Sequence, residues 1–291
     1  MKFFAMMACV GATAAAFGQY VIMPDSTNNR MVLFNPTDGS VVNSNYFALA
    51  GGTTVHAMQV GNEIWVSEQI GDRVSRWSLN GTALGAITGG LDNIRGMGMV
   101  GNTVYVTNAG TANGAPGAAV VMYDTNGNPM GSFATPNAPS PFGILAHQGG
   151  LLVSSSSAND DIHRYTLAGT SAGTFHNSTA LNFAEQMDFA PTGNILVAGF
   201  STNNVVTLDA NTGAVVNSFV ASGARGVYQL GNGNVLWSNS AGVHVYDVSL
   251  GTSSQVYAGG GRYLQYAAVP EPATMAILGG GLAVLLRRRR R

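Results

Sequence analysis

A glycine that closes a turn returns along this chain at intervals of 38 to 46 residues, and this period restricts the possible folds more than any other feature. Each of these glycines follows a short polar segment that is preceded by a large apolar residue. Glycine accepts the positive φ that tight hairpin turns require. The six glycines are Gly39, Gly81, Gly127, Gly169, Gly213 and Gly251.

Each repeat contains the patterns of four strands. The apolar residue before each glycine ends a segment of alternating hydrophobicity, as in VSRWS and VHVYD, which is typical of a half-buried strand. A β-branched, apolar strand lies upstream of it, a weaker strand follows the glycine, and a further apolar stretch leads into the next repeat. Four strands in a repeat of this length predict a β-propeller, which is an all-β fold. The upstream strands read YVIMPD, EIWVSE, TVYVTN, LLVSSS, NILVAG and NVLWSN.

The ends of the repeat region predict six blades and the way in which the ring closes. Residues 19–269 hold six sets of the three outer strands, but the first set begins directly on YVIMPD without an inner strand. The stretch from Arg262 to Val269 has the pattern of an inner strand. We expect it to join the first blade as the innermost strand, because closing the ring removes two free sheet edges.

Parts of the repeat region resemble known propeller repeats. Residues 105–108 read YVTN, and residues 204–209 read NVVTLD, followed by TGAVV. These segments are similar to the YVTN repeat family, and NHL repeats are similar at the same level. The resemblance implies a propeller fold and carries no expectation of a particular activity.

The amino terminus has the features of a secretory signal peptide. Residues 1–18 contain one basic residue, Lys2, followed by an uncharged stretch with small residues at Ala16 and Gly18. We therefore expect residues 1–18 to be removed. The only cysteine of the chain, Cys9, lies within them, and a lipoprotein signal centred on Cys9 is an alternative reading.

The carboxyl terminus, residues 270–291, has three parts. Pro270, Glu271 and Pro272 come first, an uncharged apolar segment of 14 residues follows, and five arginines end the chain. This order resembles the PEP-CTERM sorting tail. The resemblance implies transient membrane insertion through the tail, processing by an exosortase-type enzyme, and delivery to the cell surface or the extracellular matrix. A plain membrane anchor is the alternative.

Without its two ends, the domain carries a net charge of about −6 and contains no lysine. This charge argues against a nucleic-acid partner, which requires a basic face. The histidines are scattered, and no metal-ligand spacing, phosphate loop or nucleophile motif is present in the sequence. We therefore expect no metal and no cofactor.

Aligning the inner strands predicts a binding site at the mouth of the central channel. Three of the seven arginines of the domain then occupy equivalent positions and converge around the axis. Converging guanidinium groups favour an anion, such as the carboxylate of a uronate in an acidic exopolysaccharide. The alternative is that Glu185 and hydrogen bonds between blades satisfy these arginines. The candidate ligand-binding residues are His56, Arg95, Glu185, Arg225 and Arg262.

Two classes of function fit the sequence. The first is an exported, non-catalytic surface or matrix propeller that binds glycan or protein. The second is a propeller enzyme, a lactonase or lyase, that acts on extracellular sugar derivatives. Gluconolactonase-like propellers, which the fold resembles, hold a divalent metal with several carboxylates and amides, whereas the aligned positions here supply Glu185, with Asp188 three residues later. We therefore expect no catalytic residue and favour the binding protein.

Overall fold

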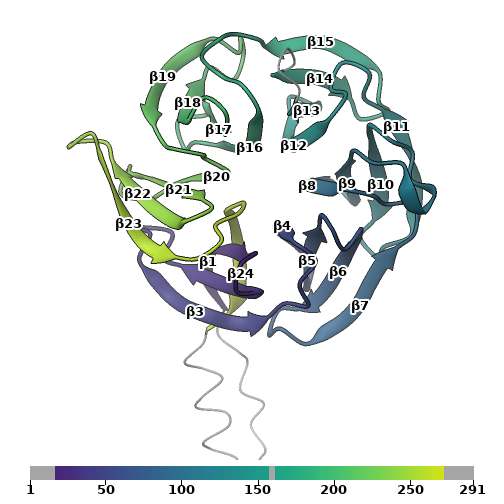
Figure 1. Cartoon of the computed structure of the whole chain (residues 1–291), viewed down its shortest axis with the longest axis horizontal. Helices are drawn as coiled ribbons and strands as arrows, with labels where there is room; N and C mark the ends of the chain where they lie inside the picture. Colours follow the sequence, from purple (N-terminus) through teal and green to yellow (C-terminus); the bar gives the residue numbers. More distant parts are fainter. Residues whose placement is uncertain (1–16, 157–160, 272–291) are drawn as a thin grey trace, which may run out of the picture.

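The computed structural model describes residues 17–156 and 161–271, and these residues form six blades around one central axis (Figure 1). Each blade is a four-stranded antiparallel sheet. Among the described residues one short 3-10 helix, η1 (Ala112–Gly114), interrupts the strands, in the loop between β9 and β10. The predicted all-β, six-bladed propeller is confirmed.

The strands of the first three blades run in order from the axis outward. Blade 1 contains β24 (Gln265–Pro270), β1 (Phe17–Asp25), β2 (Arg30–Phe34) and β3 (Val41–Ala48). Blade 2 contains β4 (Thr54–Val60), β5 (Glu63–Glu68), β6 (Arg73–Ser78) and β7 (Ala83–Thr88). Blade 3 contains β8 (Ile94–Val100), β9 (Thr103–Asn108), β10 (Ala119–Asp124) and β11 (Pro129–Ala134).

The remaining three blades follow the same order. Blade 4 contains β12 (Pro141–His147), β13 (Gly150–Ser155), β14 (Ile162–Thr166) and β15 (Ser171–His176). Blade 5 contains β16 (Ala184–Phe189), β17 (Ile195–Gly199), β18 (Asn204–Leu208) and β19 (Val215–Val220). Blade 6 contains β20 (Gly226–Gln229), β21 (Val235–Asn239), β22 (Gly242–Asp247) and β23 (Thr252–Ala258).

The carboxy-terminal strand closes the ring as predicted. Strand β24 pairs antiparallel with β1, and Phe17 lies opposite Pro270. The strand begins at Gln265, three residues later than the predicted start at Arg262. The reason is that the preceding main chain is bonded to other blades: the carbonyl of Arg262 accepts from Ser238 Oγ, and the N–H of residue 263 donates to the carbonyl of residue 55.

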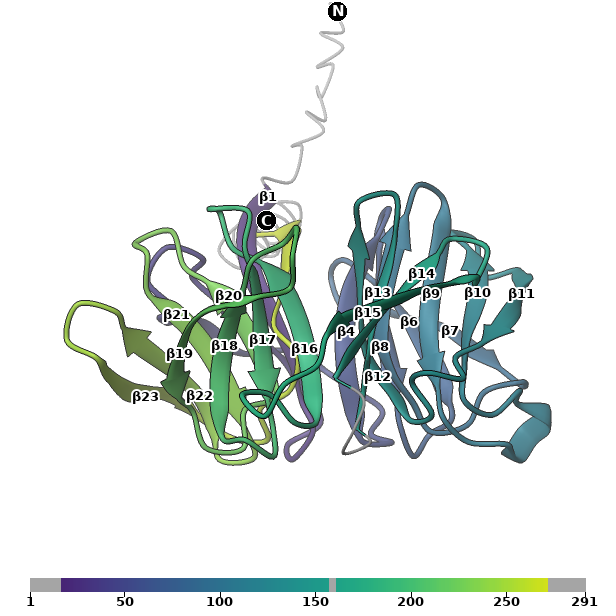
Figure 2. The ribbon, with the colours of Figure 1, turned by 90° about the horizontal axis from the view of Figure 1, so that it is seen from above.

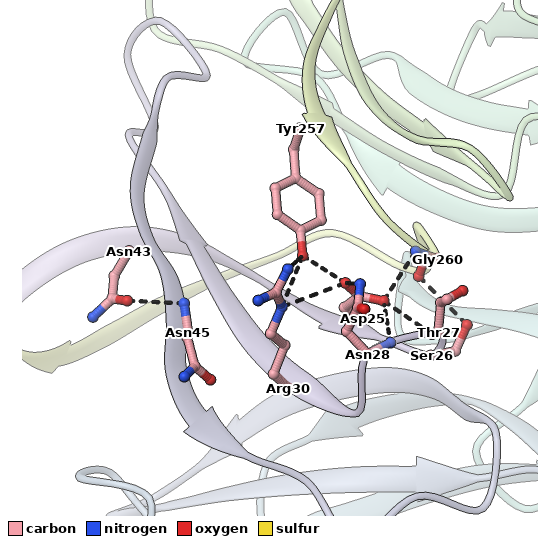
Figure 3. A network of polar contacts seen from close by, with 9 residues as sticks. All are labelled: Asp25, Ser26, Thr27, Asn28, Arg30, Asn43, Asn45, Tyr257 and Gly260. Carbon is pink, nitrogen blue, oxygen red and sulfur yellow. Dashed lines mark hydrogen bonds and ion pairs between the residues drawn. The ribbon is translucent and has the colours of Figure 1, made fainter.

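A polar clasp also joins blades 1 and 6 (Figure 3). Asp25, at the end of β1, is fully buried. Its carboxylate accepts hydrogen bonds from the Tyr257 hydroxyl, the Asn28 amide at 2.7 Å and the Gly260 N–H at 2.9 Å. Arg30 donates to the Tyr257 hydroxyl at 2.9 Å and lies 3.7 Å from the Asp25 carboxylate. The ring is therefore closed by strand pairing near the axis and by this clasp farther out.

Most of the hydrophobic core of the described residues is divided among the six junctions between neighbouring blades, and one small cluster of Val55, Phe142 and Tyr263 lies in the channel. One cluster, for example, contains Ile22 and Leu33 of blade 1 together with Ile64 and Trp77 of blade 2. Five similar clusters fill the other junctions. Each blade therefore buries both of its faces, which explains why its central strands are apolar almost throughout.

The recurring turn glycines have two structural roles. All six adopt positive φ, between 67° and 91°, as their turns predict. Some also pack closely on the preceding blade. A Cβ on Gly81 would lie 2.3 Å from Cβ of Phe47, and a Cβ on Gly169 would lie 2.2 Å from the ring of Phe133. The period therefore reflects the packing between blades as well as the turns.

Both ends of the described chain leave the propeller at the same place, because Phe17 and Pro270 are paired (Figure 2). We call this face of the ring the tail end, and the opposite face, where the inner strands begin, the arginine end. The predicted domain boundaries, at residues 18 and 270, stay predictions. Most of the predicted signal peptide and the apolar and arginine segments of the tail lie outside the described residues. Within the described part, no helix has the length and hydropathy needed to span a membrane.

Candidate binding site in the central channel

The sheet register places the aligned residues of the six inner strands at equivalent positions. In blades 2 and 3, for example, Ala57 pairs with Val66 and Met97 pairs with Val106. In each blade, the residue that precedes this paired residue of the inner strand by two positions lies at the arginine end of the channel. These positions hold Arg262, Val55, Arg95, Phe142, Glu185 and Arg225, in blade order from 1 to 6.

Local irregularities of the inner strands fall on these positions. The pairing register shifts between Thr54 and His56 in blade 2, and between Ile94 and Met97 in blade 3. Blades 4 and 5 have the same shift on either side of Phe142 and Glu185. A β-bulge changes the direction of the side chains next to it. Here it interrupts the pairing between the first and second strands of the blade, close to the axis.

Hydroxyl groups on the second strands hold the main chain of these residues. Ser67 Oγ donates to the Arg95 carbonyl at 2.5 Å, and Ser238 Oγ donates to the Arg262 carbonyl at 2.6 Å. Thr107 donates in the same way to the carbonyl of residue 142 at 2.8 Å. In each case the hydroxyl of one blade bonds to the main chain of the next blade, so the positions of Arg95 and Arg262 are fixed by the neighbouring blade.

Glu185 is the central carboxylate of the candidate site. Its side chain is 1% exposed, and Oε1 lies 3.8 Å from Nη1 of Arg225, whose side chain is 20% exposed. Burial raises the pKa of Glu185 to about 7, although Arg225, Arg262 and Arg95 each lower it. All three arginines therefore act electrostatically on this one carboxylate.

Arg95 and Arg262 are held by neutral groups as well. Nη1 of Arg95 donates to Ser140 Oγ and to the Pro141 carbonyl, both at 3.0 Å. Nε of Arg262 donates to Ser26 Oγ at 2.9 Å. Burial lowers the pKa of both guanidinium groups, and Arg225 lowers the pKa of Arg262 further. One carboxylate thus faces three cations, which leaves excess positive charge.

Several buried polar atoms of this cluster have no hydrogen-bond partner among the described residues. They include Nε of Arg95, Nε of Arg225, Oε2 of Glu185 and the hydroxyl of Tyr263. A buried polar atom without a partner is costly, and clusters of such atoms are found where a ligand or ordered water completes the bonding. The alternative prediction, in which Glu185 and contacts between blades satisfy the arginines, therefore accounts for only part of the cluster.

Three aromatic rings lie beside the arginines. The Arg95 guanidinium lies 4.3 Å from the ring centre of Phe142, and the Arg225 guanidinium lies 4.9 Å from that of Phe200. Phe183 connects them, with ring centres 4.9 Å from Phe142 and 5.0 Å from Phe200. Phe183 adopts φ of 53°, which is unusual for a bulky residue. Phe183 and Phe200 could not be predicted from the repeat pattern, because both lie in loops outside the repeating strands.

A polar cavity of about 390 Å³ flanks the aromatic pair at the same end of the ring. Its lining includes Asn177, Asn182 and Thr202, and one carboxylate, that of Asp161, which accepts from the Ser178 N–H at 2.7 Å. Asn182 directly precedes Phe183, and the main chain of Phe200 donates to the carbonyl of Phe183 at 3.0 Å. The cavity therefore adjoins the loop that carries Phe183.

The next residues along the inner strands close the middle of the channel. Tyr263, Gln186 and His56 fill it from three blades, and the other three blades carry glycine there. Gln186 Oε1 accepts from the N–H groups of residues 264 and 227, at 2.8 and 3.0 Å. A Cβ on Gly96 would lie 2.6 Å from the carbonyl of Phe142, so glycine is required for the close approach of the neighbouring blade.

His56 is fully engaged within the protein. Its Nδ1 accepts from the Met97 N–H at 2.9 Å, so Nε2 carries the proton and donates to Gln265 Oε1 at 3.1 Å. Burial lowers the pKa of His56 to about 4, and the imidazole is neutral near neutral pH. His56 therefore has no free ring nitrogen for a ligand, and the predicted ligand-binding role of Arg95, Glu185, Arg225 and Arg262 stays a prediction. Within residues 17–156 and 161–271, no three His, Cys, Asp or Glu side chains form a group able to hold a metal ion.

Comparison with known proteins identifies the tail and the fold class. The family model described as the PEP-CTERM protein-sorting motif matches residues 268–291. The chain therefore carries a PEP-CTERM sorting motif, which indicates export, processing by an exosortase-type enzyme and sorting associated with the cell envelope. A search of curated proteins found no sequence match.

Solved structures of other propellers are similar in fold. A chain of the nidogen/laminin complex has a TM-score of 0.70 at 13% identity, covering 86% of this chain and 98% of that chain. A protein of unknown function from Bacteroides caccae has a TM-score of 0.63 at 15% identity, with the same two coverages. Virginiamycin B lyase from Staphylococcus aureus, inactivated and in complex with quinupristin, has a TM-score of 0.59 at 13% identity, covering 88% and 93%. At these identities the likeness shows the propeller fold alone.

Proposed function

We propose that this protein is an exported, non-catalytic surface or matrix propeller that binds an acidic glycan at the arginine end of its channel. The observation that carries the proposal is the sheet register, which places Arg95, Arg225, Arg262 and the buried Glu185 at equivalent positions at one end of the channel, with Arg225 Nη1 3.8 Å from Glu185 Oε1. Guanidinium groups bind carboxylates through paired, charge-assisted hydrogen bonds. The excess positive charge and the unpartnered Nε atoms of Arg95 and Arg225 support an anionic ligand.

The surroundings of the arginines favour a sugar acid over an inorganic anion. Aromatic faces such as those of Phe183 and Phe200 pack against the apolar faces of sugar rings, and the adjoining cavity supplies amide and hydroxyl groups. A uronate residue presents one carboxylate and several hydroxyl groups together. The proposed subsite for its carboxylate is the arginine cluster, and that for its neighbouring sugar is the polar cavity beside Asn182.

The position of the site fits a protein sorted by its tail. The chain leaves the propeller at Pro270, whereas Arg262 lies at the other end of the closing segment, roughly 25 Å away for extended chain at about 3.3 Å per residue. The arginine end is therefore the face opposite the point at which the described chain ends, beside β1 (Figure 2). Retention at the envelope through the tail would leave this end accessible to matrix polysaccharide.

The test is binding of oligouronates to the purified protein, measured by isothermal titration calorimetry. A neutral oligosaccharide of the same length serves as the ligand control. Arg225→Gln and Arg262→Gln each remove one cation, and we expect each to weaken oligouronate binding by about tenfold or more. Arg164→Gln is the matched control, because Arg164 lies on β14, away from the axis, and contacts Phe175 instead.

Affinity for the uronate should also depend on pH. Because the pKa of Glu185 is raised to about 7, the carboxyl is neutral in mild acid and the cluster then carries its full positive charge. We expect tighter binding at about pH 5.5 than at about pH 8, and a flat profile for Glu185→Gln. Equal affinity of the wild-type protein and the folded arginine variants would refute the proposed site.

A second candidate function is a lyase acting on an acidic sugar, and one observation favours it. A buried carboxyl with a pKa of about 7 is suited to general base catalysis, and that of Glu185 lies beside three cations. In such a reaction Glu185 would remove the proton next to the uronate carboxylate, and the substituent on the neighbouring carbon would leave with its bonding electrons. Prolonged incubation with polyuronates, followed by ultraviolet detection of the unsaturated product, separates this function from binding alone.

A further inference from the structure

A second cavity opens at the tail end of the channel, on the far side of Gln186 and Tyr263. It has a volume of about 260 Å³ and is lined by the later residues of five inner strands. His56, Gln186 and Tyr263 fill the channel between this cavity and the arginine cluster. It is therefore a separate site, and the proposed glycan binding makes no use of it.

Among the described residues that line the cavity, Asp188, on β16, is the only acidic or basic side chain apart from the neutral His56. Its Oδ1 accepts a hydrogen bond from the N–H of Phe189 at 2.9 Å. In the part of the chain that the structure describes, no arginine or histidine forms an ion pair with Asp188. Asp188 is half-buried. A carboxylate that is partly shielded from water and has no counter-ion marks a place where a cation would be stabilising.

The other side chains that line the cavity are mostly apolar, and several of them are polarisable. Four methionines contribute to it, together with aliphatic side chains from β12 and the ring of Tyr266 from β24. Thioethers and aromatic faces attract organic cations through polarisability and the ring quadrupole. The amide oxygens of Gln59 and Gln265 are occupied by the Ala268 N–H and by His56. The lining thus offers one anionic group and few free oxygen ligands, which disfavours an inorganic cation. The methionines are Met58, Met97, Met99 and Met187.

We propose that the tail-end cavity binds a small organic monocation, such as a methylated ammonium compound or an alkylamine, with its charge against the Asp188 carboxylate and its alkyl groups against the methionines. A cavity of about 260 Å³ admits a compact molecule of this class but no oligosaccharide. The two ends of the channel then have opposite preferences, for anions at the arginine end and for cations at the tail end.

The ionisation of Asp188 supports this assignment. Burial raises its pKa to about 7. The titratable groups near it are Tyr228 on β20, Tyr266 on β24, Tyr263 before β24, and His56 on β4. Burial raises the pKa of Tyr228 and of Tyr263 and lowers that of His56, so these three groups are uncharged near neutral pH and the charge of the cavity follows Asp188. Binding of a cation lowers the pKa of this carboxyl and is therefore tighter above pH 7 than below it.

The test is titration of the full-length protein with choline, measured by calorimetry at about pH 8. Its neutral isostere, 3,3-dimethylbutan-1-ol, has the same shape without the charge and is expected to bind at least about tenfold more weakly. Asp188→Asn keeps the shape of the side chain and is expected to reduce choline affinity by a similar factor. Asp209→Asn, on an exposed turn of the same blade, is the matched control and is expected to leave it unchanged.

Two further measurements show whether the cation is a lipid headgroup or a soluble molecule, and whether its binding is independent of the arginine cluster. Saturable binding to phosphatidylcholine vesicles that is lost in Asp188→Asn would support the site with a lipid headgroup as ligand, whereas binding of free choline alone supports a soluble ligand. Arg225→Gln is expected to leave choline binding intact, so failure of the glycan proposal does not affect this one. Equal affinity for choline and its neutral isostere, or no binding of either choline or vesicles to a protein that melts normally, would overturn it.

Discussion

The hydroxyl of Ser238 donates a hydrogen bond to the main-chain carbonyl of Arg262, with Oγ and O 2.6 Å apart. Ser238 belongs to blade 6, and Arg262 leads into the strand that closes blade 1. The bond therefore crosses the junction at which the two ends of the chain meet. It also fixes the main chain that carries one of the three arginines of the candidate binding site.

Ser238→Ala is expected to destabilise the protein by about 1–2 kcal/mol, because it leaves a buried carbonyl without its donor. The measurement is urea unfolding followed by tryptophan fluorescence. Ser218→Ala is the matched control: Ser218 is exposed on β19, and the change should stay within about 0.5 kcal/mol. Similar losses for the two variants would show that the hydroxyl of Ser238 does not strengthen the ring closure.

Asp25→Asn is expected to weaken the clasp between blades 1 and 6. The variant loses the negative charge that accepts hydrogen bonds from Tyr257 and Gly260. We expect the free energy of unfolding to fall by an amount on the order of 3 kcal/mol. Burial raises the pKa of Asp25, but the hydrogen bonds from Asn28, Tyr257 and Gly260 lower it more, so that the pKa lies below its usual value of 3.8.

The stabilisation from Asp25 is therefore present above about pH 4 and lost as the pH falls through the lowered pKa. Chemical unfolding at a series of pH values between about 5 and 2 checks this, and the slope should be smaller for Asp25→Asn. Tyr257→Phe retains the carboxylate but removes one hydrogen-bond donor. We therefore expect its stability to lie between those of the wild type and Asp25→Asn. A wild-type protein whose stability is constant over this acid range would contradict the role of the clasp.

Gly96→Ala and Gly98→Ala form a matched pair within the single strand β8. A Cβ on Gly96 would lie 2.6 Å from the carbonyl of Phe142, whereas a Cβ on Gly98 would meet its nearest neighbour at 3.5 Å, an ordinary contact. We expect Gly96→Ala to cost about 1–3 kcal/mol through overpacking against blade 4. Gly98→Ala should be neutral or slightly stabilising, because alanine lowers the entropy of the unfolded chain. Equal melting temperatures for the two variants would disprove the packing argument.

The repeat period is sufficient to predict the blades, the closing strand and the equivalent positions of Arg95, Arg225 and Arg262 in three blades. All of these depend on register, and an alignment of equivalent strands transfers register from one blade to the next. The predicted start of the closing strand is wrong by three residues, because the main chain of residues 262–264 bonds to three other blades. Such bonds involve main-chain carbonyl and N–H groups, which leave no mark on residue type.

Other parts of the channel could not be predicted for different physical reasons. Phe183 and Phe200 come from loops, where no periodic pattern shows the direction of a side chain. The serine and threonine at the ends of the second strands, in segments such as WVSE and YVTN, are visible in the sequence. The role of these residues cannot be predicted from the sequence, because each hydroxyl bonds to the main chain of the neighbouring blade. The sequence indicates Asp188 only as a weak partner of Glu185, whereas the structure places it at the opposite end of the channel.

Glu185→Gln is expected to change how stability depends on pH. The pKa of Glu185 is raised from 4.5 to about 7 in the folded protein, chiefly by burial, so the folded state binds more protons than the unfolded state between these values. The contribution of this carboxyl is then most favourable below about pH 4.5 and declines as the pH rises to 7, by about 3 kcal/mol in all. Glutamine has no proton to lose, so the free energy of unfolding of Glu185→Gln, relative to wild type, should rise by this amount between pH 4.5 and 8. Urea unfolding of both proteins at each pH gives the difference directly and cancels the contributions of Asp188 and His56. A difference that does not vary with pH would mean that Glu185 is ionised in the folded state throughout, and that the three arginines outweigh its burial.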